Sequence, residues 1–203
     1  DPEYIYKRLF EQFEEQNYAH VISECDKHIT MFDGESIVPK YEYLKAVSKA
    51  RLYGYESYKE ALNFIALNYP NSEEGKKAEE IVQSVIPALG KKDFVDDSSG
   101  TNFKVVYQFV DIAQEEIDEF KKTLDEAVNE VKYFDLFTSK DVYTKNITFV
   151  VVHGLKSVEG ALGFAEILKD NDQEIDKEHF AISSQNYQIV QMHKNLEAYL
   201  SLQ

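Results

Sequence analysis

The feature of this sequence that most constrains its fold is a pattern of residues that occurs twice between positions 6 and 70, with the two copies 37 positions apart. In each copy, apolar residues recur in two groups at spacings of three, four and seven, which places each group on one face of a helix. Asn17 and Gly54 lie between the groups, and both residue types accept the left-handed backbone that ends a helix. Each copy therefore predicts a helix, a turn and a second helix, and such a period is typical of stacked helical hairpins.

The pattern resembles the tetratricopeptide repeat. That repeat has a large residue early in its first helix, small or apolar residues at the following inner positions, glycine at the turn and proline at the end. The second copy fits at Tyr43, Ala46, Ala50, Gly54 and Pro70, whereas the first copy carries bulkier inner side chains. A generic antiparallel pair of helices is the simpler alternative, but the match also includes the turn and the closing proline. The resemblance implies two tetratricopeptide-like α-hairpins.

A third helix is expected directly after the two hairpins, over residues 72–86. Ser72 is a suitable N-cap, and apolar residues fall on one helical face behind it. Pro87 is expected to end this capping helix because proline lacks the backbone N–H that continues one. We therefore predict an N-terminal helical domain over 1–88, followed by a polar, turn-rich linker over 89–102.

The periodicity changes after the linker, and residues 103–203 are expected to form a second domain. Strands are predicted at 103–110, within 133–143 (where Phe134, Leu136 and Thr138 alternate), at 147–153 and at 180–183, and helices at 114–131, 157–169 and 185–201. The order β-α-β-β-α-β is that of a ferredoxin-like sheet with two helices on one face, here followed by an extra C-terminal helix. The whole chain is thus predicted to belong to the α+β class.

The charge of the chain limits its partners. Acidic residues number 37 against 22 basic ones, for a formal net charge of −15 that is shared by both halves. Such a surface repels nucleic-acid phosphates and anionic membranes, so nucleic-acid binding is disfavoured. No run of about 18 apolar residues occurs, so no transmembrane segment is predicted in this stretch. The single cysteine excludes an internal disulfide.

No combination of residues predicts catalysis, a cofactor or a metal site. His20, Cys25 and His28 lie on one predicted helix but not on a common face, so core or boundary positions are favoured over metal ligation. His153 ends a strand before Gly154, where a catalytic histidine can lie, but no nucleophile or acidic partner accompanies it in the sequence. We therefore predict a protein that is not an enzyme and holds no cofactor.

Aromatic residues of the predicted sheet offer one candidate ligand surface. Tyr107, Phe109 and Phe149 are expected on its first and third strands, where RNA-binding sheets of this topology stack bases. The acidic charge disfavours phosphate and leaves a neutral glycan. Residues 150–161 also resemble the strand–glycine–helix half of the SPOR domain, which implies peptidoglycan binding as an alternative function. A face that is simply covered by the final helix is the structural alternative.

A second candidate surface is the groove of the repeat. By the usual geometry of the repeat, the first helix of each hairpin presents side chains to a partner segment. These side chains are Tyr4, Lys7, Glu11 and Glu14 in the first hairpin and Tyr41, Leu44, Ser48 and Arg51 in the second.

Taken together, the two halves resemble the C-terminal part of the SprE/PorW-type tetratricopeptide-repeat lipoproteins of gliding motility and type IX secretion in Bacteroidota. The segments that carry the likeness are 61–72, 73–86, 103–109, 134–137, 149–152 and 180–183. The resemblance implies a non-enzymatic scaffold at the periplasmic face of the outer membrane, which contacts other protein components of the machinery. Two repeats that begin abruptly at Asp1 suggest the tail of a longer array, with the lipid-bearing cysteine upstream because Cys25 lies mid-helix.

Overall fold

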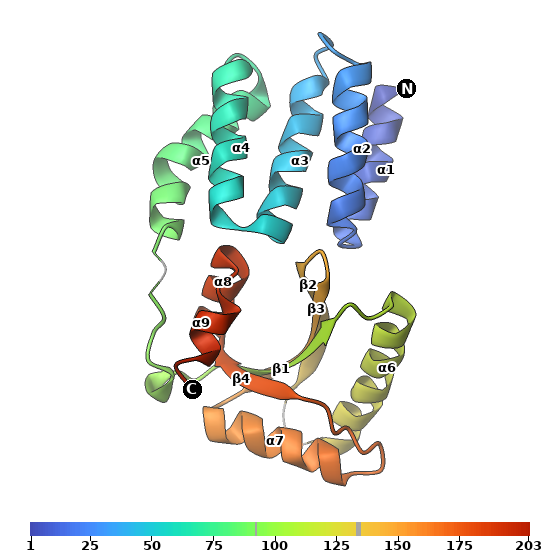
Figure 1. The fold of residues 1–203 in the computed structure, drawn as a ribbon, viewed down its shortest axis with the longest axis vertical. Helices are drawn as coiled ribbons and strands as arrows, with labels where there is room; N and C mark the ends of the chain where they lie inside the picture. Colours follow the sequence, from blue (N-terminus) through green and yellow to red (C-terminus); the bar gives the residue numbers. More distant parts are fainter. Residues whose placement is uncertain (92, 133–134) are drawn as a thin grey trace. The chain divides into compact units, whose positions relative to one another are not determined.

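The computed structural model describes residues 1–91, 93–132 and 135–203, which form an N-terminal helical region followed by a four-stranded antiparallel sheet with further helices (Figure 1). The predicted α+β class is confirmed. The chain forms two compact units. The helical unit comprises Asp1–Asp93 together with Gln191–Gln203, and the sheet unit comprises Phe94–Val190.

Five helices in chain order make up most of the helical unit, and Figure 1 shows them side by side. They are α1 (Pro2–Glu14), α2 (Tyr18–Met31), α3 (Val38–Tyr53), α4 (Tyr55–Asn68) and α5 (Glu73–Leu89). Their ends follow local chemistry. Asp1 caps α1 by accepting a hydrogen bond from the Glu3 N–H at 3.0 Å, and Ser72 caps α5 by accepting one from the Gly75 N–H at 2.9 Å. The two turns predicted at Asn17 and Gly54 separate the paired helices.

Helix α5 continues through Pro87, so the prediction that Pro87 ends it is wrong. A proline in a helix loses one hydrogen bond and crowds the turn before it. Here Pro87 lies in the last turn, and the residues after it, up to Leu89, remain helical. The helix then closes with the Gly90 N–H donating to the Ile86 carbonyl oxygen at 3.1 Å.

Two apolar clusters hold the five helices together. The first lies among α1, α2 and α3 and contains Leu9, Val21, Cys25, Ile37, Tyr41 and Leu44; the second lies among α3, α4 and α5 and contains Ala46, Tyr55, Leu62, Ile65, Ala78 and Ile86. Full burial stabilises each large apolar side chain by about 1.5–3 kcal/mol. Helix α3 contributes to both clusters, and it is therefore the central helix of the array.

The predicted helix over 185–201 is two helices, α8 (Ser184–His193) and α9 (Leu196–Leu200). Lys194 separates them with a left-handed φ of 53°. From Gln191 onward the chain belongs to the helical unit, which differs from the predicted domain of 103–203. The reason is packing: the His193 Nε2–H donates to the Leu89 carbonyl oxygen at 2.8 Å, and its ring lies 5.3 Å from that of Tyr55.

The predicted linker over 89–102 contains the unit boundary, but its second part is structured. Phe94–Asn102 belong to the sheet unit and include the short 3-10 helix η1 (Asp97–Ser99). The Asn186 side chain accepts from the Val95 N–H at 2.9 Å and donates to the Val95 carbonyl oxygen at 2.9 Å. This paired contact fixes the entry to the sheet unit against its exit.

The sheet consists of β1 (Phe103–Val110), β2 (Phe137–Thr144), β3 (Ile147–Leu155) and β4 (His179–Ser183) in the order β2-β3-β1-β4, with every pairing antiparallel. The strand predicted within 133–143 begins only at Phe137, so Leu136 precedes it and Thr138 lies in it. Phe134 lies outside the described residues. The other predicted strands agree to within two residues at each end.

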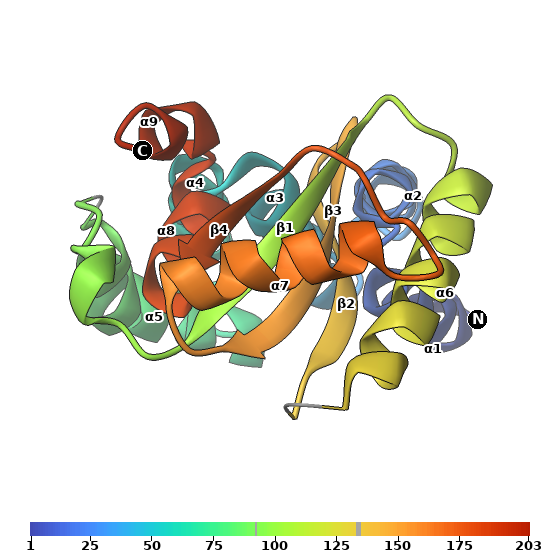
Figure 2. The ribbon, with the colours of Figure 1, turned by 90° about the horizontal axis from the view of Figure 1, so that it is seen from below.

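Helices α6 (Gln114–Val131) and α7 (Val158–Asp170) cover one face of the sheet, as the view from below shows (Figure 2). Val105, Tyr107 and Phe109 of β1 point to this face and pack with Val150 and Val152 of β3. Because side chains alternate along a strand, Lys104, Val106 and Gln108 point to the opposite face. The first part of α8 lies on that opposite face, where the Tyr187 ring is 6.2 Å from the Phe149 ring.

Candidate functional site

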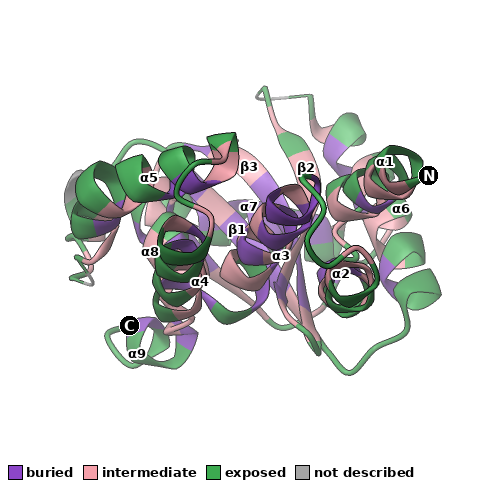
Figure 3. Cartoon of the chain, turned by 90° about the horizontal axis from the view of Figure 1, so that it is seen from above, coloured by how far each residue is buried: buried purple, intermediate pink, exposed green. Residues whose placement is uncertain are grey.

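The structure separates the eight residues predicted to line a repeat groove. Tyr4, Lys7, Glu11, Glu14 and Arg51 are exposed, whereas Tyr41, Leu44 and Ser48 are buried. The cause is the central place of α3, which Figure 3 shows coloured mainly as buried or intermediate. The Tyr41 hydroxyl donates to the Pro2 carbonyl oxygen at 2.6 Å. The eight side chains therefore do not form one open surface.

The structure also does not bring the three predicted sheet aromatics together. Tyr107 and Phe109 are 1% and 5% exposed. Their rings lie 5.3 and 4.9 Å from the ring of Phe120, which belongs to α6. Phe149 pairs with Gln108 in the β1–β3 register, so it lies on the opposite face. Tyr107, Phe109 and Phe149 thus cannot stack one ligand between them.

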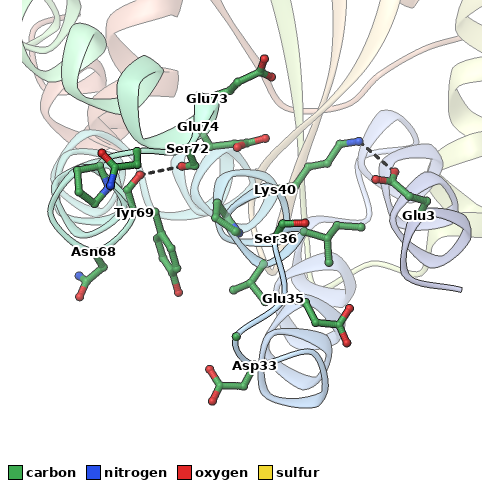
Figure 4. A pocket seen from close by; sticks show the side chains of 16 residues that line it. Glu3, Asp33, Glu35, Ser36, Lys40, Asn68, Tyr69, Ser72, Glu73 and Glu74 are labelled. Atoms are coloured by element: carbon green, nitrogen blue, oxygen red, sulfur yellow. Dashed lines mark hydrogen bonds and ion pairs between the residues drawn. The ribbon is translucent and has the colours of Figure 1, made fainter.

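A pocket of about 750 Å³ lies in the helical unit, where the ends of α2 and α4 meet the starts of α3 and α5 (Figure 4). Its walls come from two turns, one on each side, and from the first turn of α1. The lining residues are Glu3, Asp33, Gly34, Glu35, Ser36, Ile37, Val38, Pro39, Lys40, Asn68, Tyr69, Pro70, Asn71, Ser72, Glu73 and Glu74.

Local hydrogen bonds fix the first turn, between α2 and α3. Gly34 in this turn has the left-handed φ of 83° that favours glycine. The Glu35 N–H donates to the Phe32 carbonyl oxygen at 2.9 Å, and the Val38 N–H donates to the Glu35 carbonyl oxygen at 3.1 Å. This wall of the pocket is therefore held by its own backbone.

The second turn, between α4 and α5, is fixed by Ser72. Its hydroxyl donates to the Tyr69 carbonyl oxygen at 2.8 Å and accepts from the Gly75 N–H at 2.9 Å. The approach is so close that a Cβ placed on Gly75 would lie 1.8 Å from the Tyr69 carbonyl oxygen. A side chain at position 75 would thus displace the wall of the pocket.

The pocket lining combines a few buried apolar residues with several acidic side chains. Ile37, Val38 and Pro39 are buried, and Tyr69 is half-buried. The rim carboxylates belong to Glu3, Asp33, Glu35, Glu73 and Glu74. Among the described residues of the lining, Lys40 is the one basic side chain. Its Nζ lies 3.2 Å from Glu3 Oε2 and 4.5 Å above the Tyr6 ring.

The tyrosines near the pocket experience this negative field. Burial raises the pKa of the Tyr69 hydroxyl, and the carboxylates of Glu42 and Asp33 raise it further. Burial likewise raises the pKa of Tyr6, with smaller contributions from Cys25, Glu74 and Glu3 in that order. A negative field opposes ionisation to tyrosinate and attracts cations, so the site is suited to a positively charged group.

The sheet unit contains one polar cluster that resembles a catalytic arrangement. The Ser139 hydroxyl lies 2.6 Å from His153 Nε2, and Lys104 Nζ lies 2.9 Å from His153 Nδ1. Burial, with a smaller contribution from the neighbouring Lys104, lowers the pKa of His153 to about 4, although Asp141 acts in the opposite direction. The ring is therefore neutral near pH 7.

The position of the ring proton argues against base catalysis by this cluster. A protonated Lys104 donates to Nδ1, which leaves the ring proton on Nε2, directed at Ser139. A general base for serine needs a free lone pair at that nitrogen and an acceptor behind the other. With Lys104 at Nδ1 in place of a carboxylate, the cluster lacks the acceptor that holds a general-base histidine in its working tautomer.

Within residues 1–91, 93–132 and 135–203, no three histidine, cysteine or acidic side chains are arranged to hold a metal ion. None of the helices in the described part of the chain is long and apolar enough to cross a membrane. No protein-family model and no curated protein matches the chain.

Proposed function

We propose that this protein is a non-enzymatic scaffold whose helical unit binds a partner protein at the acidic pocket. The observation that carries the proposal is the pocket itself. It is concave, its walls are fixed by backbone and Ser72 hydrogen bonds, and its size falls within the range of about 300–1,000 Å³ typical of ligand sites. A preformed site of this kind binds without a large ordering cost.

The fold assignments belong to the same proposal. We assign α1–α4 to two tetratricopeptide-like hairpins and α5 to a capping helix, supported by the helix bounds and by the turns at Asn17 and Gly54. We assign the sheet unit to the ferredoxin-like fold. The strand order β2-β3-β1-β4 supports this, as does the packing of α6 and α7 on one face.

The proposed cellular role follows from the resemblance to lipoproteins of type IX secretion and gliding motility. On this proposal, the protein acts at the periplasmic face of the outer membrane, and its partners are other protein components of that machinery. The order of elements, helical hairpins followed by the β-α-β-β-α-β unit, supports the resemblance over the whole chain.

Site-specific photocrosslinking tests the scaffold proposal. A photoreactive residue at Asn71, on the pocket wall, is compared in the native cell with one at Glu60, on the exposed side of α4. We expect position 71 alone to crosslink a protein of the secretion or gliding machinery. Equal yields at both positions, or no protein adduct at position 71, would overturn the proposal.

Peptidoglycan binding by the sheet unit is a second candidate, favoured by one observation. Phe137 of β2 is 62% exposed, and its ring is stacked at 4.5 Å and 3° on that of His153. The other ring face is thus held ready for the flat side of a ligand. Co-sedimentation of the full chain with purified sacculi, lost in Phe137→Ala but kept in Phe64→Ala, is the expected result. Absence of sedimentation excludes this candidate.

A further inference from the structure

We propose that the pocket of the helical unit receives a basic side chain from an extended segment of the partner, an inference that rests on the partner-binding function proposed above. The charges of the rim, the ion pair that neutralises one of them and the buried residues of the lining together define the group that the pocket accepts.

The rim carries more negative charge than it needs for its own structure. Glu73 and Glu74 lie in the first turn of α5, where the helix dipole stabilises acidic side chains. Glu3 is in the corresponding place in α1 and also pairs with Lys40. These three residues therefore have structural roles, whether or not a partner binds.

Asp33 and Glu35 have no such role in the described structure. They flank Gly34 in the exposed turn between α2 and α3, and neither forms an ion pair with any basic side chain that the structure describes. Like charges in one rim repel one another, because the effective dielectric near a protein surface is well below that of water. A cation that enters the pocket relieves this repulsion.

Lys40, the one basic side chain among the described residues of the lining, already has partners. Lys40 Nζ is shared between the Glu3 carboxylate at 3.2 Å and the face of the Tyr6 ring. It thus lies on the α1 side of the pocket and neutralises Glu3. The other four carboxylates, Asp33 and Glu35 on one turn and Glu73 and Glu74 on the other, form no ion pair with a described basic side chain and retain their negative charge for a ligand.

The apolar residues of the lining indicate which kind of basic side chain fits the pocket. Besides the carboxylates, the lining includes the buried residues Ile37, Val38 and Pro39 and the half-buried Tyr69. Long basic side chains pack their methylene groups on apolar surface while the charged head reaches carboxylates, and guanidinium groups also stack on aromatic rings. At about 750 Å³ the pocket accommodates such a side chain together with neighbouring residues of an extended segment.

Binding of defined peptides to the full chain tests the inference. The probes are a fluorescent octapeptide of glycine, serine and proline with two arginines, and the same peptide with citrulline, which has nearly the same shape without the charge. We expect the arginine peptide to bind at least tenfold more tightly at low salt. Its affinity should decrease strongly at high salt because exposed charges are screened within about 10 Å at 0.1 M.

Matched variants locate the binding. Asp33→Asn with Glu35→Gln removes two rim charges, whereas Glu60→Gln with Glu80→Gln removes two exposed charges of α4 and α5 outside the pocket. We expect at least a fivefold loss of affinity in the first pair and less than twofold in the second. Amide shifts of Gly34 and Gly75 on adding the arginine peptide provide a readout that does not depend on fold stability.

The possible outcomes separate this inference from the scaffold proposal. Equal affinity for the arginine and citrulline peptides, or equal losses in the two variant pairs, overturns the basic occupant. A crosslink from position 71 to a partner segment without arginine or lysine overturns it too, yet leaves the scaffold in place. Tight arginine binding without any cellular adduct supports the chemistry of the pocket but refutes the scaffold.

Discussion

Replacing Gly75 by alanine tests the close approach that shapes the pocket wall. In most helices this substitution stabilises, since alanine exceeds glycine in helix propensity by about 0.8–1.0 kcal/mol. At Gly75 the new Cβ would lie 1.8 Å from the Tyr69 carbonyl oxygen and 2.6 Å from its carbonyl carbon. Both are backbone atoms, so the turn between α4 and α5 has to move.

The expected magnitude follows from two costs and one gain. Forcing an extra methyl group into packed surroundings costs about 1–3 kcal/mol, and loss of the Ser72 cap costs about 1 kcal/mol. The gain in propensity offsets about 1 kcal/mol of this. We therefore expect Gly75→Ala to destabilise the helical unit by about 1–3 kcal/mol.

The chain offers a matched control in Gly163 of α7. A Cβ at this helical position meets nothing within 4 Å, so Gly163→Ala should stabilise the sheet unit by about 1 kcal/mol. Hydrogen exchange of amides in α4, α5 and α7 reports the two units separately, which matters because a two-unit chain need not unfold in one step. A neutral or stabilising Gly75→Ala, beside a stabilising Gly163→Ala, would refute the close approach.

Three further predictions concern single contacts. The pKa of His153 is lowered to about 4 from an ordinary value near 6.5, so its contribution to stability is complete above pH 6.5 and is lost as the pH falls towards 4. We expect the free energy of unfolding to decrease by about 1–2 kcal/mol over this range after solvent screening, as measured by urea unfolding at a series of pH values. Lys104→Met should raise that pKa, as followed by NMR titration of the imidazole, and an unchanged titration would contradict the assigned contact at 2.9 Å. Tyr41→Phe should cost about 0.5–1.5 kcal/mol through loss of the hydrogen bond to Pro2, and a variant as stable as the parent in thermal denaturation would show that this bond contributes nothing.

Local patterns allowed much of the fold to be predicted from the sequence. Helix 114–131 and strand 103–110 have the predicted bounds because each carries one clear periodicity between turn residues. The place of residues 191–203 was not predictable in this way. It depends on the contact of His193 with Leu89, which lies far away in the sequence.

The candidate sites were less predictable from the sequence than the helices and strands. The register that places Phe149 opposite Gln108 is set by strand pairing, so a list of aromatic residues could not reveal which face each occupies. The sequence contains only a weak signal for the pocket. Its two turns contain Asp33 and Pro70, which lie 37 positions apart, the spacing of the two copies of the sequence pattern. The depth of the pocket depends on how side chains from different helices pack, and local sequence patterns do not reveal this packing.

The return of residues 191–203 to the helical unit makes the sheet unit an insertion within a discontinuous domain. An insertion is tolerated when its ends lie together, and the bonds between Asn186 and Val95 provide this. Folding of the sheet unit thus shortens the effective loop that the helical unit has to close. During synthesis, the cluster that receives Met192 remains incomplete until the residues after the insertion have been made.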